Sequence, residues 1–192
     1  MKIIENFLEE EYFNRLTSLF CSTSTGFTWF SRCDGTIPNQ PIHISDISVN
    51  AQPLNYFFTH VIYDKYLPCS PHYDLLTPFL VEIEKEEIEE KKLNKDKHQK
   101  LYGMRCLIRI RANYFPNTNT LHEYIPHTDC PYSHTAALLS LNTCDGYTKL
   151  VDGTKIDSVA NRVVLFDAGM NHYSTTTSDT PARFNVIVNF LQ

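Results

Sequence analysis

The chain has 192 residues and carries a formal net charge of −5 at pH 7. Its hydrophobic and charged fractions, 42% and 20%, are those of an ordinary globular protein and exclude a disordered or fibrous chain. The negative charge argues against a surface for nucleic acid or for an anionic membrane. A chain of this length normally forms one domain with its own core, so we expect a single domain over residues 1–192.

Signals for targeting or membrane insertion are missing from the sequence. No run approaches the ~20 apolar residues that span a bilayer, and acidic residues stand near the N-terminus where a signal peptide would be apolar. Six cysteines occur without a CxxC pair, which favours free thiols over disulfides or a structural zinc cluster. We therefore expect a cytoplasmic protein with no membrane partner. The oligomeric state has no signature in the sequence.

Residues 1–100 are expected to supply mostly helical support. A capping-box spacing and apolar residues at helical intervals predict a helix over residues 6–20. A second helix is predicted after Pro71, and its continuation beyond Ile83 is densely charged, which is typical of a solvated helix end.

Two segments are expected to form loops that cover a site. Residues 26–55 are rich in Pro, Ser, Thr and Asn, and residues 117–124 precede the first candidate motif. Within the first segment, the side chains that we expect to contact a substrate are Trp29, Phe30 and Arg32.

Residues 101–192 have a different character. Short β-rich segments alternate with turn residues, a spacing that predicts an all-β sandwich or jelly roll. The segments are CLIRIRANYF, AALLSLN, RVVLFDAG and ARFNVIVNFL. The predicted fold is therefore a helical N-terminal support followed by a β core.

The first motif with chemical content is His127-Thr128-Asp129. Residues two apart on a strand point to the same face, so the imidazole and the carboxylate can bind one cation. Two histidines and one carboxylate on one face of a metal leave further positions open, which is the arrangement of non-haem Fe(II) oxygenases.

A second histidine and an arginine follow near the C-terminus. His172 comes after the predicted strand RVVLFDAG, and Arg183 opens the last predicted strand eleven residues later. In that strand Arg183, Asn185, Ile187 and Asn189 share one face. An arginine that faces a cavity can form a bidentate pair with a carboxylate, as a dicarboxylate co-substrate chelating iron at its other end requires.

The order of these motifs resembles the Fe(II)/2-oxoglutarate-dependent oxygenase superfamily, and within it the prolyl 4-hydroxylase-like branch. The similar segments are IIENFLEEEYFNRL, RANYFPNTNTLHEYIPHTD, LLSLNTCDGYTKL and the VVLFD strand before His172. The resemblance implies a double-stranded β-helix, a cupin-like jelly roll. Two features depart from the family pattern: a longer loop between Tyr114 and His127, and Asp145-Gly146-Tyr147 in place of paired glycines.

The resemblance also implies cofactors and residue roles. His127, Asp129 and His172 are expected to bind Fe(II), Arg183 to bind the distal carboxylate of 2-oxoglutarate, and Tyr114 and Asn185 to line the co-substrate pocket. O2 is the second co-substrate, and ascorbate is a compatible reductant. The expected reaction is hydroxylation of a protein side chain or a small molecule.

Alternative interpretations remain open at this point. A nucleic-acid oxidative demethylase would use the same iron chemistry, and an inactive β-sandwich binding module would keep the fold without it. A zinc metalloprotease is disfavoured, because His122 and His127 are five residues apart and Pro126 would break the helix that the motif needs. The residues expected to be structural only are His122, His134, Cys130 and Ser140.

Overall fold

The structure is a computed structural model that describes residues 1–22, 26–33, 56–93 and 103–192. Its elements, in chain order, are β1 (Lys2–Ile4), α1 (Glu10–Phe20), β2 (Phe30–Cys33), β3 (Tyr56–Asp64), β4 (Leu67–Pro68), the 3-10 turn η2 (Asp74–Leu76), α2 (Thr77–Leu93), β5 (Cys106–Pro116), β6 (Thr135–Ser140), β7 (Tyr147–Leu150), β8 (Lys155–Asp157), β9 (Val163–Asp167), β10 (His172–Ser174) and β11 (Ala182–Leu191).

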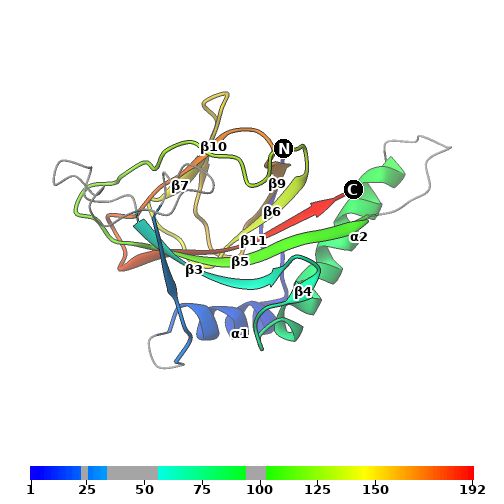
Figure 1. Ribbon diagram of the computed structural model, residues 1–192, viewed down its shortest axis with the longest axis horizontal. Helices are drawn as coiled ribbons and strands as arrows, with labels where there is room; N and C mark the ends of the chain where they lie inside the picture. Colours follow the sequence, from blue (N-terminus) through cyan, green and yellow to red (C-terminus); the bar gives the residue numbers. More distant parts are fainter. Residues whose placement is uncertain (23–25, 34–55, 94–102) are drawn as a thin grey trace.

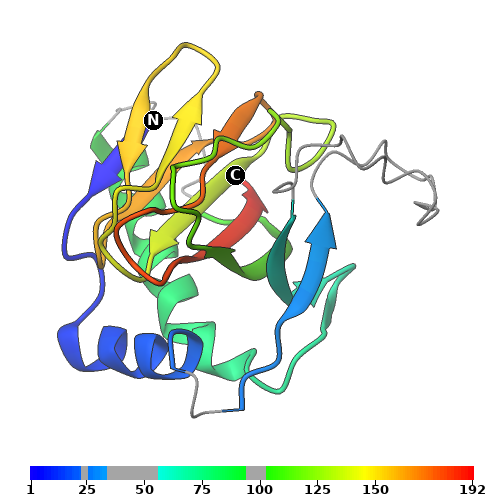
Figure 2. The same cartoon turned by 90° about the vertical axis from the view of Figure 1, so that its left-hand side faces the viewer.

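Two sheets form the β core. The larger has the strand order β1-β9-β6-β11-β5-β3-β2, with β4 paired to β3, and the smaller has the order β10-β7-β8. Every pair of neighbouring strands is antiparallel. In Figure 1 the smaller sheet lies above the larger one, and Figure 2 shows the β7–β8 hairpin from the side. This is the predicted double-stranded β-helix, and the four β segments expected after residue 101 all form strands.

A chain segment without regular strand structure extends the smaller sheet toward the site. His127 forms an antiparallel bridge with His172, Glu123 one with Thr175, and Asn117 a parallel bridge with Thr177. Residues 117–127 therefore run beside β10 and the turn after it. The segment that we expected to be a covering loop is anchored by backbone hydrogen bonds.

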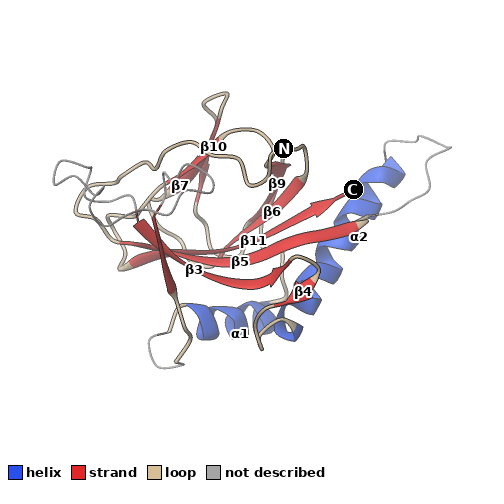
Figure 3. Ribbon diagram, in the orientation of Figure 1, coloured by secondary structure: helices blue, strands red, loops and turns tan. Residues whose placement is uncertain are grey.

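Both helices lie on the outer face of the larger sheet (Figure 3). Leu16 and Phe20 of α1 and Phe79 and Ile83 of α2 are buried in one core with the outward-facing apolar side chains of the sheet. Each such side chain contributes roughly 1.5–3 kcal/mol by leaving water. The helices thus cover one face of the sheet, and the opposite face is left to form the wall of a site.

The N-terminal half differs from the prediction in two respects. Helix α1 begins at Glu10 rather than near Asn6, because Asn6 has a φ of 50°, and the Glu9 side chain caps the helix by accepting from the Tyr12 N–H at 3.1 Å. In addition, this half supplies β1, β2, β3 and β4 to the larger sheet. The second helix begins after Pro71 as predicted.

Part of the expected covering loop, residues 34–55, lies outside the described residues, as does the Arg32 side chain. Trp29 packs against Tyr114 and Phe184, with ring centroids 5.8 and 6.1 Å away, and Phe30 is 59% exposed. The described cysteines Cys21, Cys69, Cys106, Cys130 and Cys144 are all free. None of the helices in the described ranges has the length and apolar character needed to cross a bilayer.

Candidate metal centre

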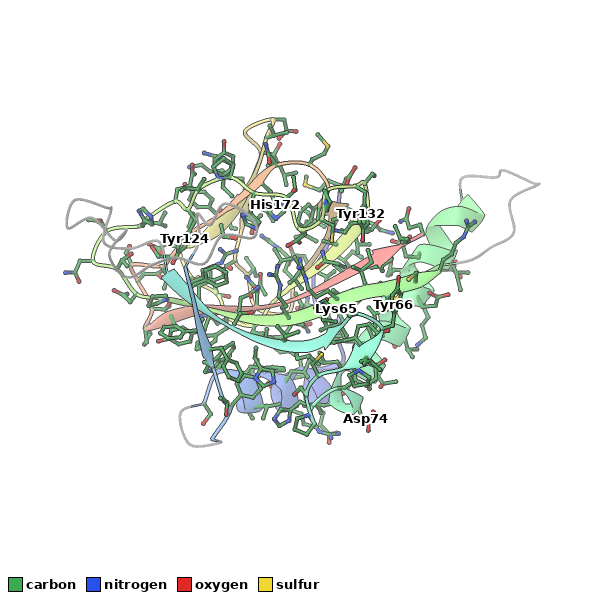
Figure 4. The ribbon with its side chains drawn as sticks, viewed as in Figure 1. Lys65, Tyr66, Asp74, Tyr124, Tyr132 and His172 are labelled. Atoms are coloured by element: carbon green, nitrogen blue, oxygen red, sulfur yellow. The ribbon has the colours of Figure 1, made fainter. Side chains whose placement is uncertain are left out.

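Three candidate ligands meet between the two sheets. Ligand atoms of His127, Asp129 and His172 all lie within 4.8 Å of one another. The two histidines are cross-strand neighbours, since each backbone N–H donates to the other's carbonyl, at 3.0 and 2.9 Å, and their rings are 4.5 Å apart. Figure 4 shows His172 on the side of the smaller sheet. Backbone pairing, rather than side-chain packing alone, therefore sets the spacing of the two imidazoles.

The surroundings of the two histidines leave ring nitrogen atoms available to bind a metal. Nδ1 of His172 lies 3.0 Å from the carbonyl oxygen of Met170, which fixes the proton on Nδ1 and leaves Nε2 with its lone pair. Burial and the neighbouring His127 lower the pKa of His172, so its ring is neutral near pH 7. Nδ1 of His127 is buried and has no hydrogen-bond partner among the described residues. Neutral imidazoles are the form that binds a metal.

Asp129 is a buried carboxylate that stays ionised. Its side chain is 1% exposed, and Oδ1 accepts from Nη2 of Arg109 at 3.0 Å and from Nη2 of Arg111 at 2.7 Å. Burial raises the pKa of Asp129, but the two guanidinium groups outweigh it, and the net pKa lies far below its usual range. Among the described residues, Oδ2 accepts from Asn189 alone, at 2.9 Å, which leaves a lone pair for a cation.

Asn189 connects Asp129 to a second buried side chain. Its Nδ2 donates to Asp129 and also lies 3.2 Å from Nε2 of His134, whose Nδ1 faces the carbonyl oxygen of Tyr132 at 2.8 Å. The Tyr132 contact assigns the His134 proton to Nδ1, so Nε2 accepts from Asn189. This chain of hydrogen bonds fixes the orientation of the Asn189 amide and, through it, that of the carboxylate.

The triad opens into a cavity of about 660 Å³ between the sheets. That volume is in the range of small-molecule sites and can hold a co-substrate together with part of a substrate. Inward-facing residues of β5 and β11 contribute polar side chains to its wall, and aromatic and aliphatic side chains contribute the apolar part. The residues that line it include Phe57, Arg109, Arg111, Asn113, Phe115, Cys130, Pro131, Leu138, Thr148, Phe166, Ser174, Asn185 and Ile187.

Arg183 is a buried cation at the far end of β11 from Asn189. Its guanidinium donates to Ser158 Oγ and Thr148 Oγ1, each at 2.9 Å, and to two backbone carbonyls. Within the described part of the chain, no carboxylate pairs with it. Burial lowers the pKa of Arg183 to about 10, so it remains charged near neutral pH. A fully buried cation held only by neutral acceptors is suited to an anionic ligand.

Thr148 connects Arg183 to the strand that carries His172. Thr148, which Arg183 contacts, pairs with Ser174, and Ser174 is two residues along β10 from His172. Two residues of a strand span about 7 Å. Arg183 is therefore joined to the cavity wall through Thr148, although Arg183 itself is not among the residues that line the cavity.

No family model and no curated protein matches this sequence, but solved structures match its fold. A 2OG-Fe(II) oxygenase family oxidoreductase from Burkholderia pseudomallei is 10% identical, with a TM-score of 0.64 over 98% of this chain and 84% of that one. A Pseudomonas putida prolyl-4-hydroxylase is 14% identical, with a TM-score of 0.59 over 100% and 92%. A Trichoplax adhaerens prolyl hydroxylase, solved with a hypoxia inducible factor peptide fragment, is 15% identical, with a TM-score of 0.59 over 99% and 82%.

The chain has the 2-oxoglutarate oxygenase fold. Within this fold the structure brings together His127, Asp129 and His172, as the sequence motifs predicted, and it places Arg183 and Asn185 on the inward face of β11. Asn185 lines the cavity and accepts from Nδ2 of Asn113 at 2.9 Å.

The expectation for Tyr114 is corrected. Its ring packs on the outer face of the sheet, 5.0 Å from Phe184 and 5.3 Å from Phe58, and Phe115 faces the cavity instead. The reason is strand alternation: Arg109, Arg111 and Asn113 point inward, so residue 114 points outward. Phe115 lies 5.3 Å from the Arg183 guanidinium and has no hydroxyl to offer a co-substrate.

The sequence interpretation missed four residues around Asp129. Arg109, Arg111, Asn189 and His134 all belong to its hydrogen-bond network, although His134 was expected to be structural only. A signal for the arginines was present, because two cations alternate with apolar residues in the otherwise β-like segment CLIRIRANYF. Cys130 lines the cavity, Ser140 is buried beside Asn185, and His122 packs edge-on to Tyr124.

Proposed function

We propose that this protein is an Fe(II)- and 2-oxoglutarate-dependent dioxygenase that hydroxylates a C–H bond of its substrate. One observation carries the proposal: an ionised, buried carboxylate and two imidazoles lie within 4.8 Å of one another on a cavity wall. The 2-His-1-carboxylate set with open positions is the arrangement that non-haem Fe(II) oxygenases use.

Each residue has a distinct role in this proposal. His127, His172 and Oδ2 of Asp129 hold the metal, and Arg183 binds the distal carboxylate of 2-oxoglutarate, with Asn185 as a further polar contact. When bound, Fe(II) and 2-oxoglutarate supply the oxidising chemistry, in which O2 is consumed and succinate and CO2 are released. The apolar residues Phe57, Phe115 and Phe166 line the cavity, where they would limit the access of water to a bound co-substrate.

The proposal also names a class of substrate. We favour a protein side chain or a small molecule, because two of the similar structures are prolyl hydroxylases and one of these was solved with a peptide fragment.

Anaerobic calorimetry tests the proposal without any knowledge of the substrate. The protein is titrated with 2-oxoglutarate in the presence and absence of Fe(II), alongside His172→Ala and the matched control His122→Ala. We expect Fe(II)-dependent binding in the wild type and the control and none in His172→Ala. A folded wild-type protein that binds 2-oxoglutarate equally well without metal, or not at all, would contradict the proposal.

A further inference from the structure

The cavity wall carries more positive than negative charge. Among the described residues that line it, Arg109 and Arg111 are cationic, only Asp129 is anionic, and the histidines are neutral in the form that binds a metal. Both guanidinium groups donate to the same atom, Oδ1 of Asp129, at 3.0 and 2.7 Å. One guanidinium is enough to neutralise one carboxylate. The second is therefore a surplus cation in direct contact with a candidate metal ligand.

Arg109 is a cation whose charge has no second anionic partner in the described structure. Its other hydrogen bonds go to neutral acceptors, the carbonyl oxygen of Asp129 at 3.2 Å and Oδ1 of Asn189 at 3.4 Å. Asp64 stands opposite Arg109 on β3, yet within the described ranges Arg109 forms an ion pair with Asp129 alone. Its side chain is 18% exposed, so water screens its charge only in part. Arg109 therefore contributes a positive charge that acts on the triad.

A divalent cation at the triad shares Asp129 with this charge. The ligand atoms of His127, Asp129 and His172 lie within 4.8 Å of one another, and Nη2 of Arg109 lies 3.0 Å from Oδ1 of the same carboxylate. Like charges close to one another in a poorly solvated site repel strongly, and a buried charge without an opposite partner is costly. Arg109 thus holds Asp129 in place by hydrogen bonding and, at the same time, disfavours the binding of a metal alone.

A dianionic co-substrate changes this balance. Arg109 and Arg111 contribute +2 and Asp129 contributes −1, so the described side chains of the cavity wall sum to +1. A divalent metal alone raises the sum to +3, whereas a divalent metal together with dianionic 2-oxoglutarate returns it to +1. The repulsion from Arg109 therefore opposes the metal alone and is offset when the dianion binds with the metal.

We propose that Arg109 is a positioning residue that acts through Asp129 to lower the affinity of the empty triad for a divalent metal, so that metal retention depends on 2-oxoglutarate. The proposal rests on the proposed function, because it concerns the metal and the co-substrate of that site. By linkage, each of these two ligands raises the affinity for the other by the same factor. The protein then releases its metal when 2-oxoglutarate is scarce.

Two substitutions of one residue separate the charge of Arg109 from its hydrogen bonds. Arg109→Lys keeps the positive charge and Arg109→Gln removes it, whereas both lose the planar donor set of arginine. Arg162→Gln, which alters an arginine that pairs with Glu5 away from the cavity wall, is the control. Thermal melts first establish that each variant is folded. Mn(II) binding is then measured from the electron paramagnetic resonance signal of the free ion, without 2-oxoglutarate and with a saturating concentration of it.

We expect Arg109→Gln to bind Mn(II) alone about tenfold more tightly than Arg109→Lys does. With 2-oxoglutarate present, the ratio of the two affinities should fall toward one, because the dianion offsets the metal charge. Arg162→Gln should match the wild type in both conditions. A role limited to holding Asp129 predicts the opposite order, since only lysine still offers a charge-assisted hydrogen bond to the carboxylate.

Equal Mn(II) affinities of the two variants without 2-oxoglutarate, or tighter binding by Arg109→Lys, would overturn the inference. If neither variant folds, the wild type decides: saturating 2-oxoglutarate must tighten Mn(II) binding more than saturating pyruvate, which has the same chelating keto acid and one negative charge fewer, and equal tightening overturns the inference.

The proposed function fails on a different result, the absence of metal-dependent 2-oxoglutarate binding in the wild type. The Mn(II) affinities of the two variants, measured without 2-oxoglutarate, still decide the role of Arg109 in that case. Wild type and variants that all bind no Mn(II) would overturn both proposals.

Discussion

Nδ2 of Asn189 donates to Oδ2 of Asp129 at 2.9 Å, and this hydrogen bond links the last strand of the sheet to the candidate metal ligand. Asn189 is completely buried, and its amide also contacts His134 and Arg109. The larger sheet therefore holds the carboxylate in place, although Asp129 itself lies in an irregular segment.

Replacing Asn189 tests how strongly this link supports metal binding. We expect Asn189→Ala to weaken Fe(II) or Mn(II) binding about 10- to 100-fold, as is typical when a partner of a ligand is removed. Calorimetric titration with the metal alone measures the effect. Asn117→Ala, which alters an exposed asparagine outside the cavity wall, is the control and should bind metal like the wild type. Equal affinity in both variants would show that the carboxylate needs no support.

Arg183 is expected to determine the affinity for 2-oxoglutarate. Arg183→Lys keeps a positive charge but loses the planar donor set, and we expect the 2-oxoglutarate dissociation constant to rise at least about tenfold. Metal binding should change little, because the hydrogen-bond partners of Arg183 among the described residues are Ser158, Tyr147, Thr175 and Thr148, and none of these is a candidate ligand. A variant that binds 2-oxoglutarate as the wild type does would remove Arg183 from the co-substrate site.

Gly146 lies where any side chain would press on Arg183. A Cβ at this position would stand 2.6 Å from the carbonyl oxygen of Thr176 and 2.7 Å from Cδ of Arg183. We expect Gly146→Ala to lower the free energy of unfolding by about 1–3 kcal/mol and to weaken 2-oxoglutarate binding. Chemical denaturation and calorimetry measure the two effects. Lys155→Ala, on an exposed position of the same small sheet, serves as control, and a Gly146 variant as stable as this one would contradict the close approach.

The lowered pKa of Asp145 predicts that the stability of the fold depends on pH. Burial raises the pKa of its carboxyl, but hydrogen bonds from Ser178 and Thr177 outweigh it and lower the pKa to about 2. A pKa that is lower in the folded than in the unfolded state stabilises the fold above pH ~4, and this contribution is lost as the pH falls toward 2. In thermal melts, Asp145→Asn should therefore differ most from the wild type at pH 5–7 and least near pH 2. A stability difference between Asp145→Asn and the wild type that grows as the pH falls would contradict this prediction.

Local patterns in the sequence indicate part of the geometry around the candidate site. Alternation in the last strand puts Arg183, Asn185 and Asn189 on one face. His127 and Asp129 do meet, but Asp129 lies in an irregular segment, so contacts with Arg109, Arg111 and Asn189 rather than strand alternation position it. Short β-rich segments separated by turn residues predicted the jelly roll. Helix α2 was also predictable, because its buried residues Phe79 and Ile83 recur at helical intervals.

What could not be predicted depends on contacts between distant segments. Tyr114 was placed in the cavity by resemblance, yet a shift of one residue in a strand moves a side chain to the opposite face. The register of β5 against β11, in which Phe115 pairs with Arg183, fixes that choice. Similarly, the network of Asp129, Asn189 and His134 joins three segments, and no local pattern indicates that they meet.

The central claim is that the triad binds Fe(II) and that 2-oxoglutarate chelates this metal. The most direct measurement is an anaerobic titration of the protein with Fe(II) and then 2-oxoglutarate, followed by visible absorption. We predict the weak charge-transfer band of a chelated keto acid in the wild type and in His122→Ala, and its loss in His172→Ala. Folded wild-type protein that gives no band and no Fe(II)-dependent binding of 2-oxoglutarate would contradict the account and leave a binding module with an oxygenase fold.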